Sequence, residues 1–372
     1  MLKQEVRSVT IFGGAGFIGS NLAHYLLKNT DARVHVFDNL SRAGVHHNLE
    51  WLRRTAGKSG RLQVTVGDVR DAQRVEKAVA TASEIYQFAA QVAVTTSLED
   101  PRHDFEVNLA GTFNILDAAR RCGNKPFIAF TSTNKVYGDL GLGAPIIHGK
   151  RYAFPDHKGI SESQPLDFHS PYGCSKGAAD QYVRDFGRVY GLPTVVFRMS
   201  CIAGPRQFGT EDQGWLAHFV YSALQDRPVV IYGDGCQVRD VLCVHDLIRA
   251  FAAVRQNIET TRTEIYNVGG GPENTISLLE LIDEIESLTG HKLEFVRSER
   301  RVGDQAIYIT DTSKITRATS WKPEIRLKET IQLLQEFWED NHDVLSTHRR
   351  TPAAVHSHSP FALATEFSGR AG

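Results

Sequence analysis

Three glycines near the N-terminus constrain the fold more than any other feature of this sequence. Gly13, Gly16 and Gly19 are evenly spaced at the junction between the apolar run 9–12 and the helical pattern that follows it. Glycines at such a junction permit a tight turn and let backbone N–H groups approach a pyrophosphate at a helix N-terminus. A purely structural strand–turn–helix connection also tolerates this spacing, so the motif needs support from elsewhere in the chain.

An acidic residue further along supports nucleotide binding at this turn. The next predicted strand, residues 33–37, is followed by Asp38, nineteen residues after Gly19. A carboxylate at this spacing typically binds the adenosine ribose 2′-hydroxyl and repels a 2′-phosphate, so the sequence favours NAD over NADP. Arg42 lies nearby, and an arginine in this region is a feature of NADP sites. The sequence therefore does not exclude NADP as the cofactor.

Strand and helix patterns alternate through the first two hundred residues. Further strands are predicted at the apolar runs 63–66, 85–90, 126–133 and 194–198, with a helical pattern at 108–121. This alternation predicts an α/β fold with a doubly wound, parallel sheet of the Rossmann type, which binds ligands at the carboxyl ends of its strands. Residues suited to cofactor contact fall at those ends, namely Asp38, Asp68, Ala89 and Thr133.

A tyrosine and a lysine share one face of a later predicted helix. The helix starts at Pro171 and ends before Gly191, and Tyr172 and Lys176 are one turn apart on it. A phenol with its ordinary pKa of about 10 is a poor base at neutral pH, and an ammonium nearby favours the phenolate. This spacing also occurs by chance on surface helices, so its context decides the interpretation.

Composition excludes several classes of protein. The 372 residues are 41% hydrophobic and 23% charged, which is typical of a globular protein. The formal net charge of −1 gives no electrostatic reason to bind nucleic acid or a membrane surface, and we find no signal peptide or membrane span. Five cysteines without CxxC spacing argue against a disulfide framework or a zinc site, so we expect no metal and a cytoplasmic location.

The pattern changes after residue 200. Residues 1–200 are interpreted as an NAD-binding Rossmann domain, to which the chain returns around 235–270, and residues 201–345 as a smaller, mainly substrate-binding lobe. Residues 346–372 mix His, Ser, Pro and Gly without periodicity and are predicted to be a flexible tail. Its histidines, His348, His356 and His358, fit a solvated tail better than a metal site.

These features together resemble the extended short-chain dehydrogenase/reductase superfamily over roughly residues 8–340. The resemblance rests on the glycine turn, Thr131-Ser132-Thr133, Tyr172-x-x-x-Lys176 and the segment 239–246. Within that superfamily the chain is similar to the CDP-tyvelose/CDP-paratose 2-epimerase family. The segments that carry this closer similarity are 91–97, 132–140, 166–181 and 206–215.

The resemblance implies roles for individual residues. Tyr172 would exchange a proton with a sugar hydroxyl, Lys176 would hold the nicotinamide ribose, and Thr133 would hydrogen-bond the same hydroxyl. The implied cofactor-binding residues are Gly13, Gly16, Phe17, Ile18, Asp38, Asn39, Asp68, Val69, Ala89, Ala90, Gln91, Asn108, Tyr172 and Lys176. The implied substrate-binding residues are Thr95, Asn134, Ser200, Arg206, Gln207, Arg239, Arg301 and Asp304.

Among the substrate residues, Arg206, Arg239 and Arg301 are candidates to anchor a diphosphate, because guanidinium groups suit phosphate oxygens. A surface salt bridge is the alternative for each of the three. Asp304 would then bind the nucleotide ribose. The segment 199–205 departs from the family pattern where it would face the sugar, so the identity of the hexose stays open.

The implied reaction is NAD-dependent inversion at carbon 2 of a CDP-hexose through a transient 2-keto sugar. A nucleotide-sugar 4-epimerase would need the same catalytic residues and is the main alternative, and a simple dehydrogenase is a further one. A 4,6-dehydratase needs two acids after the strand-end threonine, where this chain has Asn134 and Lys135. A non-catalytic NAD-binding regulator would not need Tyr172, Lys176 and Thr133. The superfamily also implies a homodimer or homotetramer, paired through the helices at 108–119 and 172–190.

Overall fold

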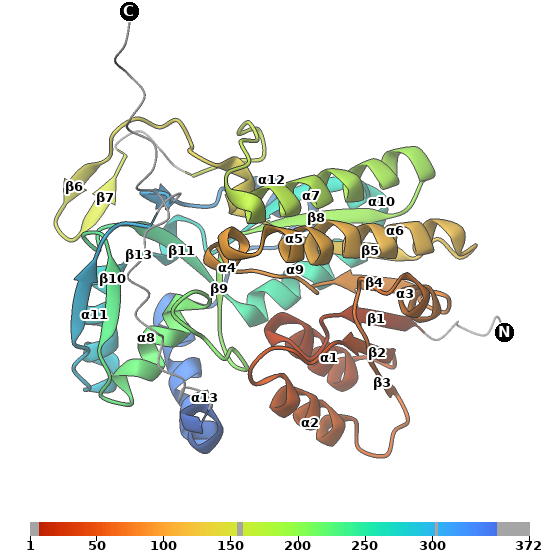
Figure 1. Ribbon diagram of the computed structural model, residues 1–372, viewed down its shortest axis with the longest axis horizontal. Coiled ribbons are helices and arrows are strands. Elements are labelled where there is room, and N and C mark those ends of the chain that lie inside the picture. The colour runs from red at the N-terminus through yellow and green to blue at the C-terminus, as the bar shows by residue number, and fades with distance from the viewer. Residues whose placement is uncertain (1–6, 155–158, 302–303, 348–372) are drawn as a thin grey trace, which may run out of the picture.

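The computed structural model describes residues 7–154, 159–301 and 304–347. Within these residues, the central element is a sheet of seven parallel strands (Figure 1). In spatial order the strands are β12 (Glu264–Val268), β8 (Thr194–Met199), β5 (Phe127–Thr133), β4 (Glu84–Gln87), β1 (Ser8–Phe12), β2 (Arg33–Asp38) and β3 (Leu62–Val66). The order reverses between β1 and β4, and sheets of this kind bind ligands at the strands' carboxyl ends near such a point.

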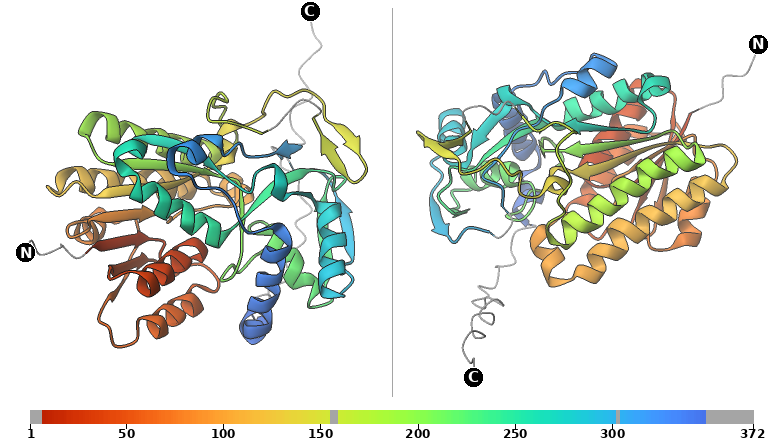
Figure 2. Two further views of the ribbon diagram at one scale, coloured as in Figure 1. Left: turned by 180° about the vertical axis from the view of Figure 1, so that it is seen from behind. Right: turned by 90° about the horizontal axis from the view of Figure 1, so that it is seen from above.

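Helices cover both faces of the sheet (Figures 1 and 2). One face carries α1 (Phe17–Asn29), α2 (Val45–Ala56) and α9 (Val244–Gln256), whose apolar side chains, such as Leu22 and Phe251, pack on the strands. The other face carries α3 (Ala72–Val79), α6 (Gly111–Arg121) and α7 (Ser170–Tyr190), with Ile115 and Val183 in its core. β5 is consequently buried along its whole length, as expected for a parallel strand between two helical layers.

A smaller lobe lies beyond the carboxyl ends of the strands. Its helices α8 (Trp215–Ala223), α11 (Leu278–Thr289) and α13 (Leu327–Thr347) enclose a separate apolar core around Leu216, Phe219 and Leu281. Its strands are β9 (Cys201–Ala203), β10 (Val229–Tyr232), β11 (Val238–Cys243), β13 (Thr275–Ser277), β14 (Phe295–Ser298) and β15 (Ile307–Tyr308).

Short elements connect these parts. They are α4 (Val94–Glu99), α5 (Pro101–Phe105), the π-helical turn η1 (Glu106–Ala110), the 3-10 turn η2 (Asn134–Tyr137), β6 (Ile146–His148), β7 (Arg151–Ala153), α10 (Ile258–Thr261), η3 (Pro272–Asn274) and α12 (Ser313–Thr319).

The fold class predicted from the sequence is confirmed, and the differences concern element boundaries. The strand predicted at 85–90 ends at Gln87, because the Gln87 side chain bonds both the N–H and the C=O of Ala89 and turns the chain away. The helix predicted at 108–121 is present and continuous, with residues 108–110 in the π-helical turn η1 and α6 beginning at Gly111. Helix α11 begins at Leu278, because Thr275–Ser277 pair with β11 and the Ser277 side chain caps the helix.

The chain crosses between the sheet and the lobe more than once. After leaving the sheet at Met199 it forms α8, β10 and β11, then returns as α9 and as the edge strand β12, and leaves again into the lobe. The predicted tail, with His348, His356 and His358, lies outside the described residues apart from 346 and 347. Among the described residues, no helix has the length and apolarity to cross a membrane, and no cluster of ligating side chains could hold a metal ion.

Candidate active site

The glycine turn lies between β1 and α1 and is packed too closely for side chains. A Cβ on Gly13 would lie 2.7 Å from the backbone nitrogen of Ala89, and a Cβ on Gly19 would lie 2.3 Å from the carbonyl oxygen of Gly13. Gly13 also has a φ of +74° and donates to the carbonyl of Phe37 over 2.8 Å. The turn therefore requires glycine for backbone conformation and for contact with the next strand.

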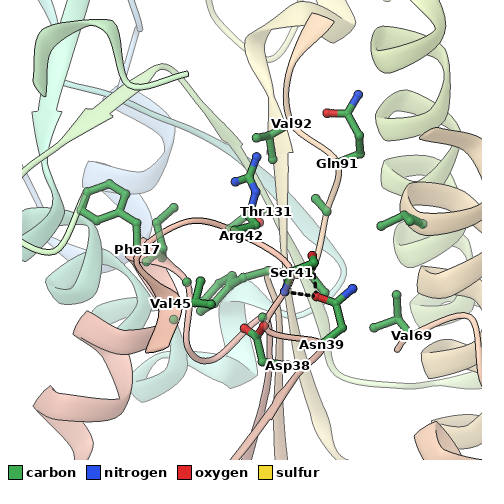
Figure 3. A pocket seen from close by; sticks show the side chains of 18 of the residues that line it. Phe17, Asp38, Asn39, Ser41, Arg42, Val45, Val69, Gln91, Val92 and Thr131 are labelled. Atoms are coloured by element: carbon green, nitrogen blue, oxygen red, sulfur yellow. Dashed lines mark hydrogen bonds between the residues drawn. The ribbon is translucent and has the colours of Figure 1, made fainter. Parts of the chain in front are cut away.

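A cavity of about 310 Å³ opens above this turn, at the carboxyl ends of β1, β2 and β4 (Figure 3). All but one of the residues assigned to the cofactor from the sequence line it, namely Gly13, Gly16, Phe17, Ile18, Asp38, Asn39, Asp68, Val69, Ala89, Ala90, Gln91, Tyr172 and Lys176. Its place at the point where the strand order reverses is the one expected for a dinucleotide site.

Two carboxylates lie at the floor of this cavity. Asp38 accepts hydrogen bonds from the backbone N–H groups of Ala15 and Leu40, at 3.0 and 2.9 Å, and burial raises the pKa of its carboxyl. Asp68 is paired with Arg70, which lowers its pKa to about 2, and it also accepts a bond from Asn39. Asp38 is thus held rigidly at the end of β2, with its charge facing the cavity.

Arg42 extends from the loop after β2 into the same cavity (Figure 3). Its guanidinium interacts electrostatically with both Asp38 and Tyr172, and burial lowers its pKa. From the sequence, Arg42 was considered only because it keeps NADP possible as an alternative cofactor. The structure shows that it also reaches the neighbourhood of the tyrosine.

Asn108 is the one predicted cofactor residue that does not line the cavity. Its side chain is buried and accepts from the Gln91 N–H at 2.9 Å, and it donates to Asp104 and to Ser175. Ser175 in turn donates to Asp104. The structure therefore places Asn108 behind the cavity wall, where it joins the loop after β4 to helix α7.

Tyr172, Thr133 and Lys176 meet where η2 and α7 begin. Tyr172 is buried and hydrogen-bonded to Thr133, the last residue of β5. The Lys176 ammonium donates to the Thr131 carbonyl over 2.6 Å and lies 4.2 Å from the centre of the Phe130 ring. The helix begins as predicted, because Ser170 caps the N–H of Gly173 and Pro171 occupies the first turn.

The pKa of the tyrosine differs from the expectation. Lys176 was expected to favour the phenolate, but burial raises the pKa of Tyr172 to about 12, outweighing the Thr133 hydrogen bond and the charge of Arg42. Burial also lowers the pKa of Lys176 to about 7, so this lysine is a weaker source of positive charge than a solvated one. Without a further cation in the cavity, the phenol remains protonated at neutral pH.

A buried ion pair holds α7 in place behind these residues. The Arg198 guanidinium of β8 binds both carboxylate oxygens of Asp180, at 2.8 and 3.0 Å, and both side chains are almost fully buried. Arg198 also donates to the hydroxyl of Tyr137, which donates to Asn267 of β12. One network thus joins α7, β8, η2 and the returning strand β12.

A second cavity, of about 540 Å³, lies between η2, the start of α7 and the lobe. Arg301 and Asp304, predicted from the sequence, line it, and so do Lys135, His169 and Arg300, which the sequence analysis did not assign to the substrate. Arg300 is next to Arg301 in the sequence and His169 lies in the segment 166–181, but their place in the cavity follows from loop geometry. Cations outnumber carboxylates on its walls, which suits an anionic ligand.

Asp304 is shared between two cations at this cavity. The Arg239 guanidinium donates to Asp304 Oδ1 over 2.6 Å and to the carbonyl of Gln305. The Lys135 ammonium lies 3.8 Å from the same oxygen. Burial and the charge of Arg239 lower the pKa of Lys135 to about 8. Arg239 does not line the cavity, whereas Lys135 lines it beside Asp304.

The structure does not bring Arg206 to either cavity. Its guanidinium lies between the rings of Trp51 and Phe337, 4.2 and 5.0 Å from their centres, and joins α2 to α13. Burial lowers the pKa of this guanidinium to about 10. The position of Arg206 depends on packing between segments that are far apart in the chain, so a local sequence motif does not predict it.

The remaining predicted substrate residues surround the two cavities without lining them. Ser200 donates to Asp240, and Gln207 is buried and donates to the carbonyl of Ile202. Asn134 is buried beside Thr133 and donates to the Gln305 side chain over 3.4 Å. Thr95 lies on α4 with a buried hydroxyl that has no hydrogen-bond partner among the described residues.

The residues of the first cavity fit a dinucleotide. The start of α1 lines the cavity through Gly16, Phe17 and Ile18, and the N–H groups of a helix N-terminus suit a pyrophosphate. The hydroxyl of Ser132 is buried at the cavity wall without a partner in the part of the chain that the structure describes, so it is available to a bound group. Asp38 is placed to accept from a ribose hydroxyl.

Comparison with known proteins agrees with this geometry. The family model described as GDP-mannose 4,6 dehydratase matches residues 10–334. This chain belongs to that family. It is an extended short-chain dehydrogenase/reductase of the nucleotide-sugar epimerase and dehydratase group.

Members of the family with several activities are similar to it. A CDP-paratose 2-epimerase of Salmonella typhi is 41% identical over 335 residues, covering 88% of this chain and 98% of the relative. The structure of a UDP-glucose 4-epimerase of Thermus thermophilus in complex with NAD has a TM-score of 0.75 at 30% identity, covering 89% of this chain and 99% of that one. A dTDP-glucose 4,6-dehydratase of Streptomyces venezuelae with NAD has a TM-score of 0.77 at 28% identity, covering 90% and 98%.

Proposed function

We propose that the protein inverts carbon 2 of a CDP-activated hexose of the paratose or tyvelose type, with NAD as its cofactor. The observation that supports this most strongly is the 41% identity to a CDP-paratose 2-epimerase across nearly the whole of both chains. Asn134 and Lys135 follow Thr133, so the paired acids needed to eliminate water are missing at that place. This argues for an epimerase over a dehydratase within the family.

The first cavity would hold NAD. The glycine turn would carry the pyrophosphate, Asp38 the adenosine ribose, and Lys176 the nicotinamide ribose. When bound, NAD supplies a hydride acceptor that removes hydrogen from carbon 2 and later returns it to the other face. Solved members of the family with 28 and 30% identity carry NAD, which supports this assignment.

Tyr172 and Thr133 would act on the 2-hydroxyl. Loss of hydride from carbon 2 requires loss of the hydroxyl proton, and the Tyr172 oxygen is the group placed to accept it. Thr133 would hydrogen-bond the same oxygen as it becomes a carbonyl. The positive charge of an oxidised nicotinamide ring would lower the pKa of Tyr172 from its raised value in the free protein, so proton transfer would be coupled to cofactor binding.

The second cavity would hold the nucleotide diphosphate while the 2-keto sugar turns over. Arg300 and Arg301 line it, and Arg301 is positioned by Asp212 and by the Tyr232 ring. Arg239 would act indirectly by fixing Asp304. A firmly held diphosphate lets the sugar present its other face without leaving the site.

A nucleotide-sugar 4-epimerase is the second candidate, and the similarity to a UDP-glucose 4-epimerase favours it. The two activities differ in which carbon faces Tyr172.

We also propose that the protein is a homodimer or homotetramer that pairs through α6 and α7. On these helices Phe113, Tyr182 and Tyr190 form an exposed aromatic surface.

The test is to incubate the purified protein with CDP-paratose, CDP-tyvelose, CDP-glucose and UDP-glucose. Proton NMR follows the sugar and absorbance follows NADH. Inversion at carbon 2 of a CDP-hexose without accumulation of NADH supports the proposal. Inversion at carbon 4 alone would establish the second candidate, and steady release of NADH would point to a dehydrogenase.

A further inference from the structure

We propose that Lys135 binds the phosphate next to the sugar and thereby selects carbon 2, rather than carbon 4, for reaction at Tyr172. This inference rests on the proposed function and extends it. The catalytic residues and the two arginines of the second cavity do not determine which carbon of the sugar reacts, and the inference assigns this choice to Lys135.

The position of a phosphate-binding cation indicates which carbon of the sugar lies at the acid–base residue. Carbon 2 of a nucleotide-linked hexose is bonded to the anomeric carbon, which carries the phosphate through one oxygen. Carbon 4 lies on the opposite side of the ring. A site that acts on carbon 2 must therefore hold the phosphate close to its acid–base residue, and a site that acts on carbon 4 must hold it further away.

The backbone of Lys135 is close to both residues of the reaction centre. Its N–H donates to Thr133 Oγ1 over 3.2 Å. Its carbonyl faces the first turn of α7, where it is the nearest group to the Cβ position of Gly173, at 3.4 Å. Lys135 thus lies between the end of β5 and the residue that follows Tyr172, and its side chain leads from there into the second cavity.

The side chain is anchored in a way that suits a phosphate contact. Asp304 Oδ1 lies 3.8 Å from the Lys135 ammonium, and Arg239 already donates to that oxygen over 2.6 Å. Asp304 therefore holds the Lys135 ammonium at the wall of the second cavity, and Arg239 fixes Asp304 in turn. Phosphate oxygens bind a lysine ammonium as a point charge, and a charge-assisted bond of this kind is stronger than a neutral one.

Two further arginines line the same cavity. Arg300 donates to the carbonyl of Asp304, and Arg301 is paired with Glu211 and Asp212 of the lobe. They suit the phosphate nearer the nucleoside. The two phosphates of a nucleoside diphosphate would then lie in line from the lobe toward Thr133, with the sugar-linked phosphate at Lys135.

The test compares the affinities for CDP and CMP by isothermal titration calorimetry, on the NAD-containing protein. CDP carries the second phosphate, which the sugar bears in the substrate, and CMP lacks it. In Lys135→Gln we expect the dissociation constant for CDP to rise about 10- to 100-fold, the loss typical of one charge-assisted hydrogen bond, while that for CMP is unchanged. Lys135→Arg should restore part of the CDP affinity.

Lys150→Gln is the matched control, because Lys150 forms an exposed ion pair with Asp283 outside both cavities. Equal losses for CDP and CMP, or no loss in Lys135→Gln, would overturn the inference. If the wild type inverts carbon 2 and Lys135→Gln binds CDP normally, only the inference fails. A wild type that inverts only carbon 4, or binds no nucleoside diphosphate, would overturn the proposed function and this inference with it. NAD content and melting temperature identify any variant that does not fold.

Discussion

Replacement of Tyr172 by phenylalanine tests the assignment of the proton acceptor most directly. The substitution removes one hydroxyl and keeps the buried ring. Among the described residues the hydroxyl is hydrogen-bonded to Thr133, and Thr133 would still donate to Asn134 and accept from the N–H of Lys135. Thr133 therefore keeps other partners, so we expect the free energy of unfolding to change by about 1 kcal/mol or less.

The effect on turnover should be far larger. A positioned acid–base group contributes about 10²- to 10⁴-fold to a rate, so kcat should fall by that factor in Tyr172→Phe. The assay follows inversion at carbon 2 by proton NMR, with NAD content measured after denaturation. Tyr182→Phe is the matched control, because Tyr182 lies on the same helix and is 44% exposed. A rate within a few-fold of wild type, with NAD retained, would remove Tyr172 from the mechanism.

Three further predictions concern the cofactor, the core and pH. Asp38→Asn should raise the affinity for NADP relative to NAD, because it removes the charge that repels a 2′-phosphate; an unchanged ratio in a binding titration would count against this role. Asp180→Asn should lower the free energy of unfolding by about 3–5 kcal/mol in denaturant melts, because it leaves Arg198 buried without its ion pair. The same change at Asp117, whose ion pairs with Arg120 and Arg121 are partly open to solvent, should have little effect, and similar losses at both sites would refute the argument. The lowered pKa of Lys176, about 7, means that the unfolded chain binds more protons above that pH, so stability should rise by about 2 kcal/mol from pH 7 to 9 in the cofactor-free protein. Lys176→Met should lose this contribution and keep the smaller one from Lys135, whose pKa is lowered to about 8. A slope equal to wild type would contradict the pKa assigned to Lys176.

Local patterns predicted the parts of the site that depend on local geometry. The glycine turn, Asp38 and the Tyr172–Lys176 pair each lie within a single strand–turn–helix unit or one helix, so sequence spacing determines their position. These residues line one cavity as expected. The same holds for the fold class, which follows from alternating strand and helix patterns.

The remaining features depend on contacts between distant segments. Arg206 packs between Trp51 and Phe337, and no local motif indicates that these two rings meet. Lys135 was noted only because it is not an acid; its place beside Asp304 depends on how the lobe folds back over η2. The raised pKa of Tyr172 likewise comes from burial by several elements, which the spacing to Lys176 does not reveal.

The repeated crossing of the chain between sheet and lobe limits how the protein can be divided. A fragment that ends at residue 200 would lack β12, so β8 would become an edge strand, paired only with β5 and open to aggregation on its other side. It would also lack Leu247 and Phe251 of α9, which are fully buried in the core on one face of the sheet. We therefore expect neither half to fold alone. Exchanging the substrate lobe between relatives would require matched junctions at several places in the chain. A change of sugar specificity is therefore easier to reach by substitutions around the second cavity than by recombination of whole segments.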